Sequence, residues 1–300
     1  MKLGKNMIKN GVYAAGLSIL KEDLSLDIKS TIAHAEAIIK NGLHGVFFFG
    51  STGQSQLISI SEKKELISKT STSKFKNQFF IGTGVNSLKD NIDIIRYSME
   101  YGYQTFLIMP PAYYKGNSDE GVFNFYSEII SKIPKIKIIL YNFEKLSGYL
   151  FNQDIVKKLV NNFPKQVIGC KDSSYNLFES LKIPNFKMFP GSEAKLLKGL
   201  ELGCSGCISA VTNVTHSLAR KVFDDFEGKK NQTINEKLVN VRQTFDNYPL
   251  ISALHSFLNE ENKVYKNILP PLTLLNSEKK QELLSKLKKI NFIPEKNIAA

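Results

Sequence analysis

Residues 11–50 have the sequence GVYAAGLSILKEDLSLDIKSTIAHAEAIIKNGLHGVFFFG. Two apolar runs, Val12–Ser18 and Gly45–Gly50, flank the segment Ile28–Asn41, in which apolar residues recur at helical spacing. Each run is apolar on both faces, as is typical of a parallel strand that is covered on both sides. This stretch therefore predicts a strand, a helix and a second strand parallel to the first.

The same alternation continues along the chain. Six further apolar runs follow, at Phe79–Val85, Thr105–Pro110, Lys137–Tyr141, Val167–Lys171, Phe186–Phe189 and Gly206–Ala210. Further helical patterns lie between the runs, at Ser61–Ser68, Asn152–Asn161 and Leu196–Leu202. Eight strand–helix units in about 225 residues match the repeat length of a TIM barrel. The predicted fold class is therefore α/β, a (β/α)8 TIM barrel.

The last third of the chain lacks strand-like runs. Helical patterns occur at His216–Phe226, Gln232–Tyr248, Ile251–Leu258 and Ser277–Lys288. No segment is rich enough in Gly, Ser or Pro to divide the chain into independent domains. We expect residues 1–215 to form the (β/α)8 barrel with the active site, and residues 216–300 to form the last barrel helix and a C-terminal helical appendage.

The chain is basic, with 40 Lys and Arg against 28 Asp and Glu, for a net charge of +12. Its arginines are Arg96, Arg220 and Arg242, and the other basic residues are dispersed lysines. Arginine is the side chain best suited to bidentate phosphate contacts, so this pattern is typical of a solvated surface and predicts no nucleic-acid partner. It would still attract a carboxylate substrate.

Cysteines and the N-terminus suggest no further chemistry. The pair Cys204 and Cys207 has no second pair or nearby His to complete a zinc site, so no metal is predicted. Lys2, Lys5 and the apolar Gly11–Leu20 loosely resemble a signal peptide, but no small-x-small cleavage site follows. The apolar segment is also too short to span a bilayer. We expect a cytoplasmic protein with no membrane partner.

Two candidate catalytic residues close apolar runs. In a TIM barrel the active site lies at the C-terminal ends of the strands, and Lys171 and Tyr141 stand at two of these ends. Burial disfavours an ammonium, and a neutral amine is the nucleophile that forms a Schiff base with a ketone. A tyrosine hydroxyl there can transfer protons. Taken singly, each residue could also be structural, a lysine that reaches the rim or an ordinary buried tyrosine.

Two other segments lie at predicted strand ends. Gly50-Ser51-Thr52-Gly53 offers consecutive backbone N–H groups that suit a carboxylate, or hydroxyls that cap the next helix. Tyr113-Tyr114 follows Pro110-Pro111, either near the mouth of the barrel or at a subunit interface.

Taken together, these segments resemble the dihydrodipicolinate synthase / N-acetylneuraminate lyase family of class I, Schiff-base aldolases. The matching segments, in order, are Gly50-Ser51-Thr52-Gly53, Gly82-Thr83-Gly84, Pro110-Pro111 with Tyr113-Tyr114, Tyr141-Asn142, Gly169 to Ser174, Gly191-Ser192-Glu193, Gly206 to Ser209, and Leu269-Pro270-Pro271-Leu272. Each segment is short, but their shared order covers nearly the whole chain.

The resemblance implies three catalytic residues. Lys171 would form the Schiff base with pyruvate or a related 2-oxo acid, and Tyr141 would transfer protons. Tyr114 would be lent to the site of a neighbouring subunit. The resemblance therefore implies a homo-oligomer, a dimer or a homotetramer, that uses no metal or organic cofactor.

The resemblance also implies substrate contacts. Ser51 and Thr52 would hold the carboxylate of the 2-oxo acid, largely through backbone N–H groups. Ile208 would line the pyruvate pocket.

The departures from the family pattern bear on the substrate. Leu146 stands where the synthases carry an arginine that binds the carboxylate of their aldehyde substrate. Ser173 places a hydroxyl where lyases of sugar acids have one. Glu193 is kept as a polar substrate contact, but Ala194 follows it where sialic acid lyases carry a second acid, and Gln54 replaces the usual Glu.

We therefore predict a lyase that cleaves a 2-oxo-3-deoxy sugar acid, or a similar hydroxylated 2-oxo acid, to pyruvate and an aldehyde. One alternative is 4-hydroxy-tetrahydrodipicolinate synthase of lysine biosynthesis. Another is a non-catalytic binding or regulatory protein on the same barrel, against which the intact Lys171, Tyr141 and Ser51 argue.

Overall fold

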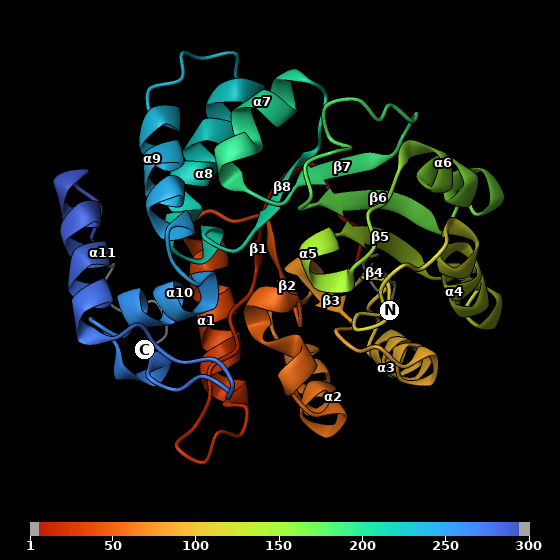
Figure 1. The fold of residues 1–300 in the computed structure, drawn as a ribbon, viewed down its shortest axis with the longest axis horizontal. Helices are drawn as coiled ribbons and strands as arrows, with labels where there is room; N and C mark the ends of the chain where they lie inside the picture. The colour runs from red at the N-terminus through yellow and green to blue at the C-terminus, as the bar shows by residue number, and fades with distance from the viewer. Residues whose placement is uncertain (1–5, 294–300) are drawn as a thin grey trace.

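A computed structural model describes residues 6–293. Eight parallel strands form one sheet in the order β7-β6-β5-β4-β3-β2-β1-β8 (Figure 1). The strands are β1 (Gly11–Ala15), β2 (Gly45–Phe48), β3 (Phe79–Gly82), β4 (Thr105–Ile108), β5 (Lys137–Asn142), β6 (Val167–Asp172), β7 (Lys187–Pro190) and β8 (Gly206–Ser209). Each overlaps one predicted apolar run, so the predicted α/β class is confirmed.

The sheet curls into a barrel that is nearly closed between β7 and β8. The N–H of Ser205, just before β8, donates to the carbonyl of Met188 in β7 at 2.8 Å. On its other side β8 pairs with β1 so closely that a Cβ on Gly206 would collide with the carbonyl of Gly11. Gly206 also has a φ of 134°, which other residues rarely adopt. The predicted (β/α)8 barrel is thereby confirmed.

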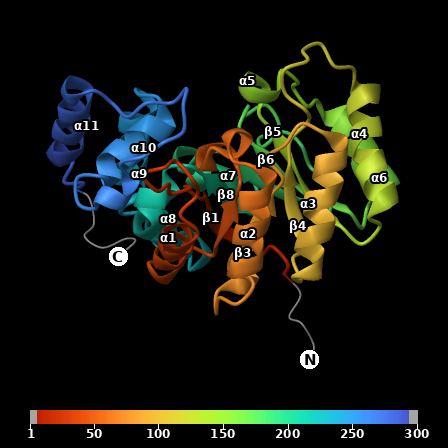
Figure 2. The same ribbon diagram turned by 90° about the horizontal axis from the view of Figure 1, so that it is seen from below.

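Helices surround the barrel (Figures 1 and 2). They are α1 (Ile28–Lys40), α2 (Ile60–Thr70), α3 (Leu88–Glu100), α4 (Asp119–Lys132), α6 (Gln153–Asn162), α7 (Leu196–Glu201) and α8 (Thr212–Glu227), with the short α5 (Glu144–Ser147) after β5. The structure adds α3 and α4 to the predicted helices. Helix α2 starts at Ile60, before the predicted Ser61, because Ser59 and Glu62 form a reciprocal capping box.

Three more helices, α9 (Asn235–Asp246), α10 (Leu250–Leu258) and α11 (Ser277–Lys289), follow the barrel and lie on the side of α1 and α8 (Figure 1). Helix α9 packs against α8 and against the turn η4 (Glu193–Lys195) that follows β7. This packing brings α9 to the C-terminal ends of the strands. The outer ends of the two predicted units, residues 1–5 and 294–300, lie outside the described residues.

Alternate strand residues fill the inside of the barrel. The interior cluster consists of Ile8, Tyr13, Phe47, Phe80, Leu107, Ile139, Tyr141, Phe189 and Ile208. The ring of Tyr13 meets those of Phe80 and Phe189 edge-on, with centroids 5.7 and 5.8 Å apart. This packed interior supports Tyr141 from below. Within residues 6–293, no helix is long and apolar enough to cross a membrane.

Candidate active site

Lys171 and Tyr141 are neighbours at the C-terminal ends of β6 and β5. The strand register pairs them directly, and their side chains are only 3% and 4% exposed. Lys171 Nζ lies 4.2 Å from the centroid of the Tyr141 ring. Both residues line one cavity, so a nearly buried amine and a phenol face the same space.

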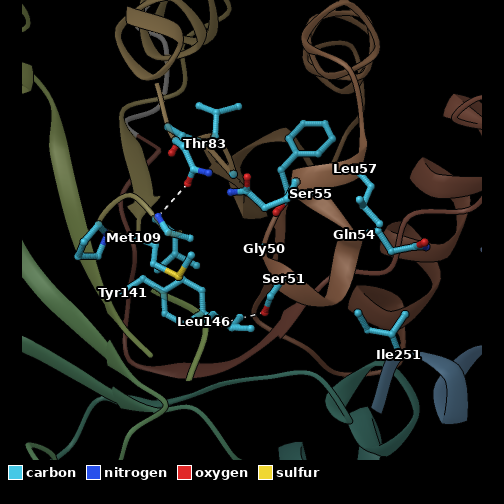
Figure 3. A pocket seen from close by; sticks show the side chains of 18 of the residues that line it. Gly50, Ser51, Gln54, Ser55, Leu57, Thr83, Met109, Tyr141, Leu146 and Ile251 are labelled. Atoms are coloured by element: carbon cyan, nitrogen blue, oxygen red, sulfur yellow. Dashed lines mark hydrogen bonds between the residues drawn. The ribbon is translucent and has the colours of Figure 1, made fainter. Parts of the chain in front are cut away.

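Ser51 connects β2 to this pair. Its Oγ lies 2.9 Å from Tyr141 Oη, and Figure 3 shows this contact from the side of an adjoining cavity that both residues also line. Either hydroxyl can donate, so a proton can pass along the contact in either direction. The sequence predicted both residues at strand ends but could not predict this hydrogen bond.

Ser51 also begins the short turn η1 (Ser51–Gly53). The N–H groups of Gly53 and Gln54 donate to the carbonyls of Gly50 and Ser51. The N–H groups of Ser51 and Thr52 have no hydrogen-bond acceptor in the described part of the chain. Ser51 and Thr52 both line the cavity, so these two donors are available to an anion beside Tyr141.

Asp172 fixes the loop that follows Lys171. Its carboxylate is fully buried and accepts hydrogen bonds from the side chain of Asn142 at 2.8 Å and from the N–H of Tyr175 at 2.9 Å. The same carboxylate accepts two more backbone N–H groups, those of Leu177 and Phe178. These bonds hold Tyr175 in a left-handed conformation with a φ of 62°. The ends of β5 and β6 are thus locked together.

Ser173 lies on this fixed loop and lines the cavity. It packs so closely over Gly191 that a Cβ there would collide with the serine Oγ. The N–H of Ser173 donates to the carbonyl of Asn142 at 2.8 Å. Gly191 thus leaves room for the Ser173 hydroxyl at the cavity wall.

The cavity has a volume of about 810 Å³, within the range of ligand-binding sites. Its lining residues are Ser51, Thr52, Tyr141, Phe143, Glu144, Lys145, Lys171, Ser173, Ser174, Tyr175, Gly191, Ala210, Arg242, Asp246, Tyr248 and Leu250. They come from five strand ends, those of β2, β5, β6, β7 and β8, and from the segment that carries α9 and α10. The C-terminal appendage therefore forms part of the site.

A second, apolar cavity of about 260 Å³ adjoins the first at Ser51 and Tyr141. Leu146 lies on its wall, together with Met109 and Ile251 (Figure 3). The hydrocarbon side chain of Leu146 can offer no charge-assisted contact to a substrate.

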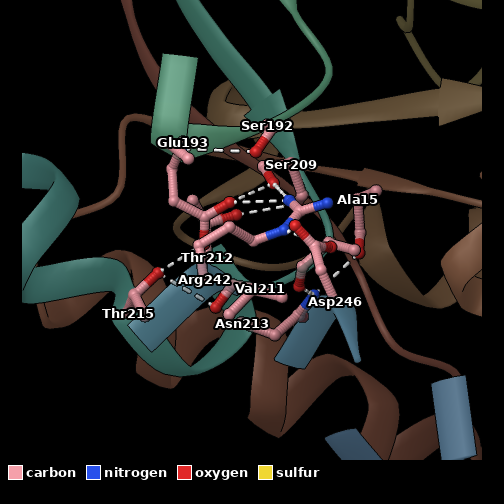
Figure 4. Close-up of polar contacts among 12 residues, drawn as sticks. Ala15, Ser192, Glu193, Ser209, Val211, Thr212, Asn213, Thr215, Arg242 and Asp246 are labelled. Atoms are coloured by element: carbon pink, nitrogen blue, oxygen red, sulfur yellow. Dashed lines mark hydrogen bonds and ion pairs between the residues drawn. The ribbon is translucent and has the colours of Figure 1, made fainter. Parts of the chain in front are cut away.

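Glu193 lies behind the main cavity and is fully buried. It accepts hydrogen bonds from Thr215 Oγ1 at 2.8 Å, from Ser209 Oγ, and from Arg242 Nη1 at 2.9 Å (Figure 4). Burial disfavours the charge of Arg242, but Glu193 and Asp246 outweigh it and raise the pKa of the guanidinium. Glu193 and Arg242 therefore form a buried ion pair, and Arg242 is the partner that reaches the cavity.

The structure brings five of the predicted site residues to one cavity: Lys171, Tyr141, Ser51, Thr52 and Ser173.

The other three predicted residues lie elsewhere. Glu193 is fully buried behind Arg242, which disfavours direct contact with a substrate. Ile208 is fully buried in the barrel interior, and Ala210 is the residue after β8 that lines the cavity. Tyr114 lies on the surface, 74% exposed, and its role at another subunit's site stays a prediction.

Two residues that were not predicted from the sequence, Arg242 and Asp246, reach the cavity from α9. Their spacing of four residues on a helix was the only local signal. Arg220 and Asp224 have the same spacing and form an exposed ion pair on α8, so the signal does not identify a site.

A second buried lysine, Lys63 on α2, was also missed. Its Nζ donates to the carbonyls of Thr83 and Gly84, at 3.2 and 2.7 Å. Burial lowers the pKa of the Lys63 ammonium to about 8, although Asp90 opposes the shift. Lys63 thus holds the loop after β3. In the described part of the chain, no three His, Cys, Asp or Glu side chains are grouped so that they could hold a metal ion.

This fold and this site define a carbon–carbon lyase of the aldolase type on a (β/α)8 barrel. The chain belongs to the dihydrodipicolinate synthetase family, whose model matches residues 9–290.

Several known proteins are similar to it. A 2-dehydro-3-deoxy-D-gluconate/2-dehydro-3-deoxy-phosphogluconate aldolase of Picrophilus torridus is 26% identical over 76% of this chain and 86% of its own length. A 4-hydroxy-tetrahydrodipicolinate synthase of Thermus thermophilus is 25% identical, over 92% of this chain and 94% of its own. The crystal structure of dihydrodipicolinate synthase from Agrobacterium tumefaciens has a TM-score of 0.85 and 26% identity, covering 94% of this chain and 99% of that one. Relatives thus carry both aldolase and synthase names.

Proposed function

We propose that this protein cleaves a 2-oxo-3-deoxy sugar acid, or a similar hydroxylated 2-oxo acid, to pyruvate and an aldehyde through a Schiff base at Lys171. The observation that carries the proposal is the shared position of three groups in one cavity. The Lys171 amine lies over the Tyr141 ring, and the Tyr141 hydroxyl is hydrogen-bonded to Ser51. A nucleophile and a proton-transfer group are therefore within reach of one bound ketone.

The proposed reaction begins when neutral Nζ of Lys171 adds to the 2-oxo carbon. Tyr141 donates its proton to the departing hydroxyl, which leaves as water, and this gives a protonated imine and a tyrosine phenolate. The phenolate oxygen of Tyr141 then accepts the proton of the C4 hydroxyl. The C3–C4 bond breaks, its electron pair moves into an enamine, and C4 leaves as an aldehyde. Protonation of the enamine carbon and addition of water then release pyruvate and the free amine.

The carboxylate of the 2-oxo acid would bind at the turn η1. The unpaired N–H groups of Ser51 and Thr52 support this position, because consecutive N–H donors suit an anion. Contacts of Ile208 and Glu193 with the substrate, which the family resemblance suggests, have less support. Both side chains are fully buried, so we place them beneath the site.

The residues that line the two adjoining cavities support a lyase of hydroxylated acids over the synthase. Leu146 offers no cation to the second carboxylate that the synthase substrate carries, whereas Ser173 offers a hydroxyl partner to a sugar-like chain. One observation favours the synthase as a second candidate: Lys145 also lines the cavity and could supply a cation. It lacks the bidentate geometry of an arginine.

We also propose that the protein is a homo-oligomer, a dimer or a tetramer, in which Tyr114 completes the site of a second copy. Tyr113 and Tyr114 are 84% and 74% exposed, an unusual state for two adjacent aromatic rings. Tyr113 also has a φ of 83°, so the chain holds this pair in a strained turn.

The test compares two reactions of one enzyme preparation, cleavage of 2-oxo-3-deoxy acids and condensation of pyruvate with aspartate semialdehyde. We expect kcat/KM for cleavage to be at least about tenfold higher, because an unpaired carboxylate in a partly dry site costs more than 1.4 kcal/mol. Leu146→Arg should narrow the difference, provided that Glu144 does not bind the new guanidinium. A wild-type enzyme that prefers aspartate semialdehyde would overturn the proposal and point to Lys145 as the substitute cation.

A further inference from the structure

The wall of the cavity that α9 supplies carries an arginine and a carboxylate one helical turn apart. Arg242 Nε donates to Asp246 Oδ1 at 2.9 Å. Arg242 is nearly buried, whereas the side chain of Asp246 is 48% exposed, and both residues line the cavity. The reaction at Lys171 does not use this pair.

Most of the donors of Arg242 are already engaged. Nη1 donates to Glu193 at 2.9 Å and to Ser209 at 2.8 Å, and Nε donates to Asp246 (Figure 4). Within residues 6–293, no hydrogen bond involves Nη2 of Arg242 or Oδ2 of Asp246. One donor nitrogen and one acceptor oxygen therefore remain for a ligand.

This arrangement excludes a bidentate grip on an anion. A carboxylate or phosphate binds an arginine through two adjacent nitrogens, either Nε with Nη2 or Nη1 with Nη2. Each of these edges includes a nitrogen whose hydrogens Asp246, Glu193 or Ser209 already hold. Arg242 therefore cannot act as the arginine that is missing at Leu146.

The charges on this wall also disfavour the binding of an anion. Glu193 and Asp246 carry two negative charges against the single positive charge of Arg242. Glu144 and Lys145, which also line the cavity, carry opposite charges, and the remaining charged lining residue, Lys171, lies at the reacting end. An anionic group at this end would meet the free oxygen of Asp246, and like charges there would repel it.

We propose that Arg242 and Asp246 form a hydroxyl-binding subsite for the far end of the substrate, which selects an uncharged polyhydroxylated chain over a phosphorylated or dicarboxylic one. A hydroxyl both donates and accepts, so it matches one free donor and one free acceptor. This inference rests on the proposed function, because the subsite has a role only if a 2-oxo acid binds at Lys171. Glu193, held by Ser209 and Thr215, positions Arg242 from behind.

The test varies Asp246, since removal of Arg242 would leave Glu193 buried without its partner. The probes are a six-carbon 2-oxo-3-deoxyhexonate, its 6-phosphate, and the four-carbon 4-hydroxy-2-oxobutanoate, which has no hydroxyl beyond C4. Asp246→Ala should lower kcat/KM for the hexonate by about tenfold or more, mainly through KM, because the hydrogen bond lost involves a charged group. Cleavage of the four-carbon acid should change by less than about twofold, and the preference for hexonate over its phosphate should shrink.

The matched control is Asp224→Ala, which removes the carboxylate of the exposed Arg220–Asp224 pair on α8. It should leave all three substrates unaffected. Equal losses on the hexonate and the four-carbon acid, a wild-type preference for the phosphate, or a wild-type enzyme that cleaves the four-carbon acid but not the hexonate would each overturn the subsite. Failure of wild-type protein to trap pyruvate at Lys171 would instead overturn the proposed function.

Discussion

Replacing Arg242 with leucine removes the counterion of a carboxylate that has no access to water. Glu193 is 0% exposed, and its nearest cation is Arg242 Nη1 at 2.9 Å. Hydrogen bonds from Ser209 and Thr215 would remain, but hydroxyl donors do not neutralise a charge. Breaking a buried ion pair on one side costs about 3–5 kcal/mol, so we expect the free energy of unfolding to fall by that amount.

Urea denaturation followed by circular dichroism measures this loss. Arg220→Leu is the control, since its pair with Asp224 is exposed and such pairs contribute about 0–1 kcal/mol. Adding Glu193→Gln to Arg242→Leu should recover part of the stability, because a neutral amide can still bond Ser209 and Thr215. If Arg242→Leu costs no more than Arg220→Leu, or if Glu193→Gln gives no recovery, Glu193 and Arg242 are not coupled as described.

Three further outcomes follow from the site and the core. Tyr141→Phe should lower the cleavage rate by roughly 10²–10⁴-fold while pyruvate trapping persists, and a near wild-type rate would remove Tyr141 from proton transfer. His34 and His255 are fully buried, and burial lowers the pKa of each to about 4. The unfolded chain therefore binds more protons than the folded chain between about pH 6.5 and 4. The free energy of unfolding should fall by up to about 3 kcal/mol per imidazole as the pH drops through this window. A urea midpoint that stays constant between these pH values would contradict the buried, neutral state of the two histidines. If Tyr114 completes a neighbouring site, dilute active protein should sediment as an oligomer, and fully active 33.8 kDa monomers would refute the shared site.

Much of the barrel could be predicted because each strand is a short run that is apolar on both faces. The runs Gly45–Gly50 and Val167–Lys171 therefore indicated both strand position and strand end. Helices α3 and α4 were not delimited from the sequence, although Leu88, Ile92, Ile95 and Met99 of α3 recur at helical spacing.

The candidate site also contains residues that the sequence predicted and residues that it could not predict. Lys171, Tyr141 and Ser51 were predictable because parallel strands bring their C-terminal ends together. Arg242 was not, because it reaches the cavity from a helix that follows the barrel, through packing of α9 on η4. Such packing depends on contacts between distant segments, which no local pattern encodes.

Covalent trapping with pyruvate probes the Schiff base at Lys171. Borohydride with pyruvate should reduce the imine to a stable adduct, and peptide mass mapping should place it on Lys171. Lys63 is the internal competitor, because its pKa is lowered to about 8, but its Nζ is bound to two carbonyls. We expect an adduct on Lys171 in wild-type protein and none in Lys171→Ala. An adduct on Lys63, or comparable trapping by Lys171→Ala, would contradict it.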